Sequence, residues 1–304
     1  MKGVDPKLFP YSKHEIDACG FRMAYVDEGS GDETILAVHG NPTWSFYYRR
    51  VIEQFSGQRR VVAVDHVGCG QSDKPSQSEF DYTLESHRDN VVALIDELDL
   101  ENITLLAHDW GGAIGLASVL QRKQKFNRII LLNTGAFPPP YVPLRIAACR
   151  IPLFGTLGVR GFNLFAKAAI TMAMSRNKLD RSVAAGLLAP YDNWKNRVAV
   201  DAFVRDIPRH PNHVTYSALQ ELSSRLPELA SMPSLLVWGM KDWCFRPECL
   251  RIFQEHWPDA ITREIADAGH YVIEDAPDET LAAIAEFLEC GSKERTIDVA
   301  KSGG

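Results

Sequence analysis

The sequence predicts an α/β fold, in which a mostly parallel, eight-stranded sheet is flanked by helices and carries a helical cap after its sixth strand. The first half of the chain alternates short β-branched runs with longer helical patterns. Such alternation is typical of doubly wound sheets with right-handed crossovers. It stops at about residue 136 and resumes near residue 234. With 304 residues, the chain is long enough for one such core and an insertion.

The first half of the chain contains six predicted strands. Glu15–Cys19 and Phe21–Val26 are interpreted as an antiparallel hairpin. Short aliphatic and β-branched runs then predict buried parallel strands. These runs cover Thr34–Val38, Arg60–Val64, Ile103–Ala107 and Arg128–Leu132.

Helical patterns lie between the parallel strands, near Thr43–Phe55, Tyr82–Leu98 and Gly111–Lys123. In the second of them, apolar residues recur on one face, as expected of a helix that packs on a sheet. The basic pair Arg49–Arg50 is interpreted as an ordinary solvated helix face.

The middle of the chain predicts the cap, because prolines, aromatics and helical stretches replace the strand pattern there. Its apolar residues are interpreted mainly as the cap's own core, with a lipid-sized tunnel as the alternative; they are Leu153, Phe154, Phe162, Leu164, Phe165, Ile170, Met172 and Met174. Strand–helix alternation then resumes with Ser234–Trp238, Pro247–His256, Ile261–Ile265 and a last helix that begins near Pro277. The predicted division is a core over 1–135 and 227–290, a cap over 136–226 and a mobile polar tail over 291–304.

Composition narrows the classes of function. The net charge of −6 and the scattered Lys and Arg argue against a nucleic-acid partner, which needs a clustered basic surface. The six cysteines show no CxxC spacing, so neither a metal site nor a disulfide framework is expected. We expect reduced thiols in a cytoplasmic protein, no signal peptide, no membrane span and no cofactor.

The strongest local motif is LAHDWGG, in which a buried strand runs into two glycines that open a helix. Small residues stand two positions before and after Asp109, at Ala107 and Gly111. This is the spacing of a nucleophile elbow, where the sharp turn tolerates only small neighbours. Asp stands where such elbows usually carry Ser. Taken alone, the motif also fits an aspartate that caps a helix after a strand.

Three further segments favour the elbow interpretation. His39-Gly40-Asn41-Pro42 follows a predicted strand, where an oxyanion loop is expected, so the backbone N–H groups of Asn41 and Trp110 are the candidate donors. Asp242 and His270 follow two successive later strands, 28 residues apart. The carboxyl ends of parallel strands share one sheet edge, where ligands bind. The order nucleophile, acid, histidine is also the order that nucleophile-elbow folds use.

An aspartate nucleophile implies a two-step reaction. Asp109 is ionised near neutral pH and needs no base to attack. His270 is then free to take a proton from the water that hydrolyses the covalent ester, while Asp242 orients the imidazole and stabilises its cation. Carboxylates are poor at attacking amide carbonyls but can displace a leaving group from an alkyl carbon. The predicted substrate is therefore a small apolar molecule with a C–halogen bond, an epoxide or a strained lactone.

The chain resembles the haloalkane dehalogenase family of the α/β-hydrolase superfamily from about residue 10 to residue 290. The segments that carry the resemblance are HGNPTWSFYYR, DHVGCGQSDKP, LAHDWGG, LLNTGAF, WGMKDWCF and AGHYVIEDAPDE. The resemblance implies that the side-chain amide of Asn41 and the indole N–H of Trp110 bind the departing halide. It also implies that the products are a halide ion and an alcohol.

One position departs from part of that family. Some members carry the acid after the sixth strand, where this chain has Asn133, so Asp242 must serve. Asn133 and the RGFN and RDIP segments make the chain most similar to the third dehalogenase subfamily, which overlaps the β-lactone decarboxylases of bacterial olefin biosynthesis. The resemblance therefore also implies a homo-oligomer.

Four functions stay open at this point. The first is hydrolytic dehalogenation, and the second is opening of a β-lactone by the same residues to give CO2 and a cis-alkene. An epoxide hydrolase would need two cap tyrosines, for which Tyr141, Tyr191 and Tyr216 are available. A non-catalytic ligand receptor on this scaffold is the fourth, and the complete set of candidate residues argues against it.

Overall fold

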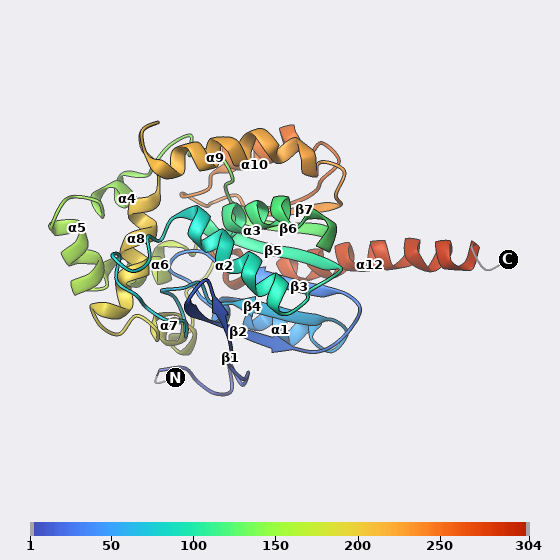
Figure 1. Ribbon diagram of the computed structural model, residues 1–304, viewed down its shortest axis with the longest axis horizontal. Coiled ribbons are helices and arrows are strands. Elements are labelled where there is room, and N and C mark those ends of the chain that lie inside the picture. Colours follow the sequence, from blue (N-terminus) through green and yellow to red (C-terminus); the bar gives the residue numbers. More distant parts are fainter. Residues whose placement is uncertain (1–2, 302–304) are drawn as a thin grey trace.

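A single eight-stranded sheet, in the order β1-β2-β4-β3-β5-β6-β7-β8, forms the centre of the computed structural model (Figure 1). The structure describes the backbone of residues 3–301 and the side chains of residues 3–290. β1 and β2 pair antiparallel, β2 pairs antiparallel with β4, and the other pairs are parallel. The strands are β1 His14–Ala18, β2 Phe21–Glu28, β3 Thr34–Val38, β4 Arg60–Val64, β5 Ile103–Asp109, β6 Phe126–Thr134, β7 Ser234–Gly239 and β8 Ile261–Ile265. The predicted fold class is confirmed.

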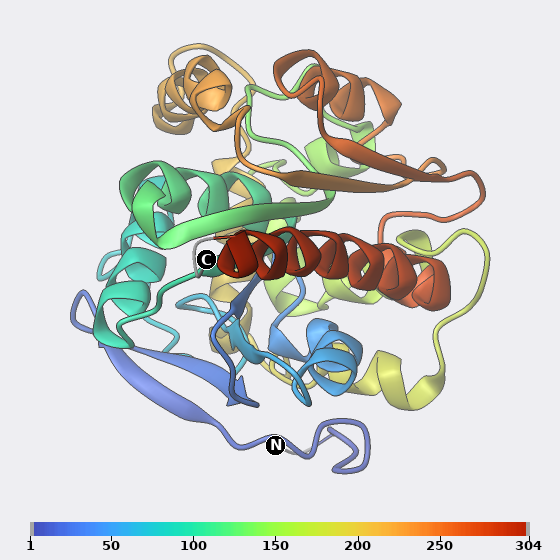
Figure 2. The same cartoon turned by 90° about the vertical axis from the view of Figure 1, so that its right-hand side faces the viewer.

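Successive side chains of a strand point to opposite faces of the sheet, and helices cover both faces. In β3, Leu36 and Val38 belong to one core cluster, whereas Ile35 and Ala37 belong to the other. The first cluster includes residues of α2, α3, α9 and α10; the second includes residues of α1 and α12. Figure 2 shows α1 and α12, in light blue and red, on the opposite side of the sheet from α2 and α3. The core helices are α1 Arg49–Phe55, α2 Leu84–Glu97, α3 Trp110–Gln121, α10 Pro247–His256, α11 Val272–Asp275 and α12 Pro277–Lys301.

The helical cap lies between β6 and β7. Its helices α4 to α8 gather at one end of the molecule, and α9 returns along α2 and α3 (Figure 1). They are α4 Leu144–Ala148, α5 Phe154–Thr156, the π-helical turn η3 Leu157–Gly161, α6 Leu164–Met172, α7 Arg181–Leu188, α8 Val198–Asp206 and α9 Val214–Arg225. Short 3-10 turns are η1 Ser45–Tyr48, η2 Lys123–Lys125, η4 Lys195–Arg197 and η5 Leu226–Leu229. Within the described residues, no helix is long and apolar enough to span a membrane.

Several sequence-based expectations need correction. The helix predicted over Thr43–Phe55 is a 3-10 turn followed by α1. Arg49 is not solvated: its guanidinium is buried and pairs with the buried carboxylate of Glu274, 225 residues away. A buried charge needs such a partner, and no local pattern reveals one.

The predicted tail begins inside α12, whose backbone continues to Lys301. Residues 302–304 lie outside the described chain, and mobility of the tail stays a prediction.

The apolar cap residues do not behave as one set. Phe165 lines a pocket and packs against a small cluster within the cap, as a tunnel or a cap core would require. Ile170 and Met174 pack instead against the second core cluster, which belongs to the sheet. Four others are exposed instead, so for these both the cap-core and the tunnel interpretation are wrong. They are Leu153, Phe154, Phe162 and Leu164.

Candidate active site

Asp109 occupies a strained turn between the end of β5 and the start of α3. Its backbone adopts φ 55° and ψ −130°, a conformation that L-residues rarely take and that marks functional sites. The two glycines that follow are required by space. A Cβ at Gly111 would overlap the carbonyl of Val38, and one at Gly112 would overlap the side chain of Thr134. The sharp turn therefore places the Asp109 carboxylate at the carboxyl edge of the sheet.

The loop after β3 holds this carboxylate. The backbone N–H of Asn41 donates to Asp109 Oδ1 at 2.6 Å, and the backbone N–H of Trp110 also donates to the carboxylate. A Cβ at Gly40 would collide with the Asp109 side chain, so the close approach needs glycine. β3 and β5 are the neighbouring strands at which the strand order reverses, where open α/β sheets bind ligands. The two predicted N–H donors thus converge on one carboxylate.

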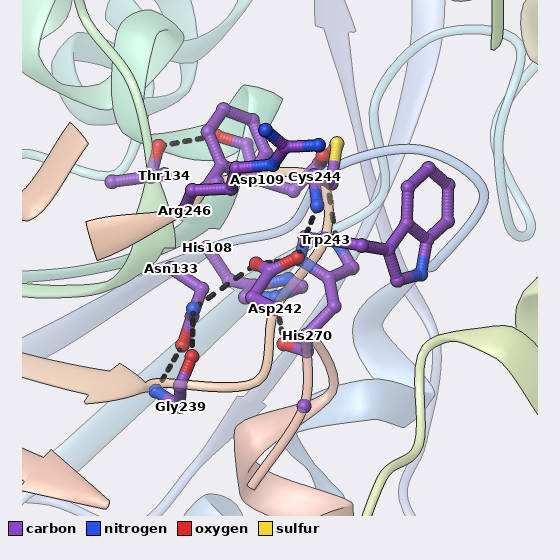
Figure 3. A network of polar contacts seen from close by, with 12 residues as sticks. His108, Asp109, Asn133, Thr134, Gly239, Asp242, Trp243, Cys244, Arg246 and His270 are labelled. Atoms are coloured by element: carbon purple, nitrogen blue, oxygen red, sulfur yellow. Dashed lines mark hydrogen bonds and ion pairs between the residues drawn. The ribbon is translucent and has the colours of Figure 1, made fainter. Parts of the chain in front are cut away.

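His270 lies between two carboxylates, as Figure 3 shows. Its Nε2 is 3.6 Å from Asp109 Oδ2, and its Nδ1 is 2.8 Å from Asp242 Oδ2. The histidine follows β8 and Asp242 follows β7, so adjacent strand ends bring the two together. The structure therefore brings together Asp109, His270 and Asp242 with the N–H groups of Asn41 and Trp110.

Asn133, at the end of β6, positions Asp242. Its Nδ2 donates to Asp242 Oδ2 at 3.0 Å and to the Gly239 carbonyl at 3.1 Å, and its Oδ1 accepts from the Gly239 N–H at 2.8 Å (Figure 3). The backbone N–H of Cys244 donates to Asp242 Oδ1 at 2.6 Å. In the sequence, Asn133 is visible only as a departure from the family. Its position at the end of β6, next to β7, is the signal that could have predicted this contact.

Replacing Asn133 with alanine is expected to lower kcat about tenfold with little change in KM, because a hydrogen bond to a charged group contributes about 1.5–3 kcal/mol and the substrate is not touched. Steady-state kinetics test this. The matched control is Asn127→Ala, an exposed asparagine on the same strand, which should leave kcat unchanged. An increase in KM alone would mean that Asn133 acts on substrate binding instead.

Burial and charge set the protonation of the two central groups. Burial raises the pKa of Asp109 above its ordinary value, against the attraction of His270 and the two backbone N–H donors. Burial also acts to lower the pKa of His270, but the charge and hydrogen bond of Asp242, with the charge of Asp109, outweigh it, and that pKa is raised. The histidine is therefore tuned by both of its carboxylate neighbours.

The pH dependence of turnover follows from this arrangement. Hydrolysis of an ester on Asp109 needs a neutral His270, so kcat should rise with pH through the pKa of this histidine. Esterification removes the negative charge of Asp109, which is one of the charges that raise that pKa. The acidic limb of kcat is therefore expected at lower pH than the titration of His270 in the free enzyme. Rate profiles between about pH 5 and 9, compared with an NMR titration of the imidazole, measure this. A limb at higher pH would contradict it.

A largely apolar pocket opens above these residues. Asn41, Asp109, Trp110 and His270 line it together with side chains from the cap. Among the described residues, Asp109 and His270 are the only lining side chains that carry charge. The apolar lining includes Phe137, Pro139, Val142, Ile146, Phe165 and Val204. Such a site suits a small apolar molecule and excludes bulk water.

The two predicted halide donors differ in how far they are engaged. The indole Nε1 of Trp110 has no hydrogen-bond partner within the described chain, although the residue lines the pocket. The side-chain amide of Asn41 donates one N–H to the Val200 carbonyl at 3.3 Å, and its Oδ1 is buried without a partner. The indole N–H is therefore free to bind a ligand, whereas one N–H of the Asn41 amide is already used by the Val200 carbonyl.

Other titratable groups near the site have structural roles. His39 accepts from the backbone N–H of His66 at 3.0 Å, and burial lowers its pKa to about 3. Nε2 of His108 is hydrogen-bonded to the His270 carbonyl at 2.9 Å. Tyr141 lines the pocket, but its hydroxyl donates to the carbonyl of Cys244.

Comparison with known proteins places the chain among enzymes. A family profile for the alpha/beta hydrolase fold matches residues 33–277. A cis-3-alkyl-4-alkyloxetan-2-one decarboxylase of Shewanella oneidensis is 40% identical over 92% of this chain and 89% of its own length. Haloalkane dehalogenase 2 of Mycobacterium bovis is 32% identical over 93% of this chain and 96% of its own. Among solved structures, tetrameric haloalkane dehalogenase DpaA from Paraglaciecola agarilytica matches with a TM-score of 0.76 and 30% identity, covering 93% of this chain and 94% of that one.

Proposed function

The chain belongs to the α/β-hydrolase-fold family, in the group that holds haloalkane dehalogenases and cis-3-alkyl-4-alkyloxetan-2-one decarboxylases, and we propose that the carboxylate of Asp109 displaces a leaving group from an alkyl carbon. One observation carries the proposal. The carboxylate stands on a strained elbow beneath an apolar pocket, with Oδ1 held by the Asn41 N–H and Oδ2 3.6 Å from His270. It is thus oriented to attack a ligand in the pocket, and a base lies beside it.

The first candidate reaction is hydrolysis of a haloalkane to an alcohol. An Asp109 oxygen bonds to the alkyl carbon as the carbon–halogen bond breaks, and the halide leaves with the bonding electron pair. A water molecule then gives a proton to His270 Nε2 and adds to the ester carbonyl. The N–H groups of Asn41 and Trp110 stabilise the oxyanion, and Asp242 stabilises the imidazolium. Collapse of this intermediate releases the alcohol, and the proton passes to solvent.

The free indole N–H of Trp110 is proposed as the principal halide donor. Trp110→Phe keeps the ring but removes the donor, and it is expected to slow bromide release from a bromoalkane about 10- to 100-fold. The matched control is Trp243→Phe, in the same pocket, because that indole N–H already donates to the Met172 carbonyl at 2.6 Å. Equal losses in the two variants would contradict the assignment.

A β-lactone is the second candidate electrophile. The observation that favours it is the 40% identity to a relative whose name describes that activity, against 32% to the dehalogenase. Attack of Asp109 on the ring alkyl carbon would open the lactone to an enzyme-bound carboxylate. Loss of CO2 would then form the carbon–carbon double bond and expel Asp109 as the free carboxylate. This route balances without water, so it does not need His270 as a base.

A single comparison separates the two electrophiles. Wild-type protein is incubated with a 1-bromoalkane and, separately, with a cis-3,4-dialkyl β-lactone, and bromide, alcohol and alkene are quantified. Bromide release with equimolar alcohol is the expected result for the first candidate. Alkene with no bromide release would replace it with the second. Asp109→Asn is the control for both substrates, and turnover by this variant would contradict the nucleophile itself.

Two other functions are not favoured. Epoxide opening needs tyrosine hydroxyls directed into the pocket, but Tyr141 donates to a backbone carbonyl, and the buried Tyr191 donates to the Thr43 carbonyl. Tyr216 does not line the pocket. A non-catalytic receptor would have no use for a nucleophile, base and acid in contact.

We further propose that the chain acts as a homo-oligomer in the cytoplasm. Support for assembly comes from the relative DpaA, whose structure is described as tetrameric. The cysteine pattern without a disulfide framework fits a reducing compartment. Sedimentation velocity of the purified chain measures the assembly directly.

A further inference from the structure

Eight large apolar side chains between residues 144 and 194 of the cap are exposed to solvent. Their exposed fractions run from 47% for Trp194 to 87% for Leu144. Within the described chain, the other exposed large apolar side chains are Val214, which begins the cap helix α9 at 58% exposed, and Ile261 of β8, at 40%. We call the eight the apolar cap face: Leu144, Ile151, Leu153, Phe154, Leu157, Phe162, Leu164 and Trp194. Exposed apolar groups gathered in this way mark an interaction site.

Members of the apolar cap face lie next to one another. The side chain of Leu157 and the ring of Trp194 both lie against Gly161, and Leu164 lies against Gly158. The turn η3 contacts α5 on one side and α6 on the other. Figure 1 shows α4 and α5 at the outer end of the cap, away from the end at which α12 leaves the body. The elements that carry most of the face, from α4 to α6, therefore lie at one end of the molecule.

Charge around this face differs from that of the whole chain. Residues 141–179 contain six Lys and Arg and no Asp or Glu, although the chain carries a net charge of −6. Within the described residues, no carboxylate lies within 4.0 Å of the cationic groups of the first four of the six, so none of these forms a salt bridge. They are Arg145, Arg150, Arg160 and Lys167. Arg145 and Arg160 lie over the rings of Trp243 and Trp194, and Arg150 donates to the Ile207 carbonyl, but none of the four has a carboxylate partner in the part of the chain that the structure describes. An apolar surface with cations that lack carboxylate partners is complementary to an anionic lipid surface.

The same face adjoins the pocket. Pro143 and Ile146, next in sequence to Leu144 and Arg145, line the pocket, and so does Phe165, next to Leu164. We propose that the apolar cap face docks on an anionic lipid bilayer, so that apolar substrates pass from the membrane into the pocket. A second copy of the chain fits this face less well, because a two-fold interface would bring the cations of one face against those of the other.

Vesicle co-sedimentation tests the proposal with the full chain. Large unilamellar vesicles of phosphatidylcholine with about 30 mol% phosphatidylglycerol are compared with pure phosphatidylcholine vesicles at low and high salt. The protein is expected to sediment with the anionic vesicles, less with the neutral ones, and less at high salt. Absence of binding to anionic vesicles at saturating lipid would overturn the proposal.

Two variants locate the contact. Leu153→Ser/Phe154→Ser should weaken partitioning at least about tenfold by removing inserted apolar area, and Lys167→Gln should weaken it about fivefold by removing one cation. The matched controls, Ile261→Ser and Arg251→Gln, change exposed residues outside the cap and should bind as wild type does. Equal binding by the cap and control variants would overturn the proposal. Sedimentation velocity could also overturn the proposal. An oligomer of the wild-type chain that dissociates in the Leu153→Ser/Phe154→Ser variant would show that the face is buried between copies.

Discussion

Replacing His270 with alanine is expected to stop the reaction after its first step and to leave an alkyl ester on Asp109. The carboxylate needs no base to attack, so the ester still forms when a bromoalkane binds. Water is then no longer deprotonated beside the ester, since Nε2 is the basic atom 3.6 Å from Asp109 Oδ2. The expected fall in kcat is about 10⁴-fold.

Intact-protein mass spectrometry measures this result as an increase of one alkyl group, and peptide mapping assigns it to Asp109. His210→Ala, an exposed histidine of the cap, is the matched control and should turn over at the wild-type rate without an adduct. An alkyl group on Cys244, which lines the same pocket, would contradict the assignment of the nucleophile. Absence of any adduct with a range of electrophiles would do the same.

Asp109→Asn is expected to abolish turnover and at the same time to stabilise the fold. The amide cannot attack an alkyl carbon as the carboxylate does, so kcat should fall by about 10⁴-fold or more. Asn tolerates positive φ, and its Oδ1 can still accept from the Asn41 N–H. Burial raises the pKa of Asp109, so the folded state disfavours its charged form. The neutral amide avoids that cost.

The sign of the pH dependence follows from the raised pKa. An acid whose pKa is higher in the folded state binds its proton more tightly there, so it destabilises the fold as pH rises above the unfolded value and up to the folded one. The gain from Asp109→Asn should therefore be larger near pH 8 than near pH 4, because at pH 4 an unfolded-state aspartate is only about half ionised and little of the cost has developed. Thermal unfolding at the two pH values measures it, with an expected gain of about 1 kcal/mol at the higher pH. A variant less stable than wild type at pH 8 would contradict this account.

Most of the fold was predictable because buried strands carry their own signal. β3, β4, β8 and α10 have the predicted bounds. For β3 and β4 the reason is that a buried aliphatic run ends where a turn begins. β5 is two residues longer than predicted and ends on Asp109 itself. The burial of Arg49 was not predictable, because its partner Glu274 comes from the other end of the chain.

The site was predictable where one local motif fixes the geometry. The elbow at Asp109 needs only its small neighbours, and the order of the later motifs places Asp242 and His270 at the same sheet edge. The contact of Asn133 with Asp242 could be predicted only from the position of β6 beside β7 in the sheet, and not from either local motif. The exposed Leu153 and Phe154 were missed because an apolar pattern does not show what, if anything, covers it.

A single turnover in H2¹⁸O tests the covalent ester most directly. Wild-type protein in excess over a 1-bromoalkane is quenched after one turnover, and both the alcohol and the peptide that contains Asp109 are analysed by mass spectrometry. We predict alcohol with ordinary oxygen, taken from the Asp109 carboxylate, and one ¹⁸O in that carboxylate, because water adds to the ester carbonyl. Alcohol labelled with ¹⁸O and an unlabelled Asp109 would show direct displacement by water and would contradict the account.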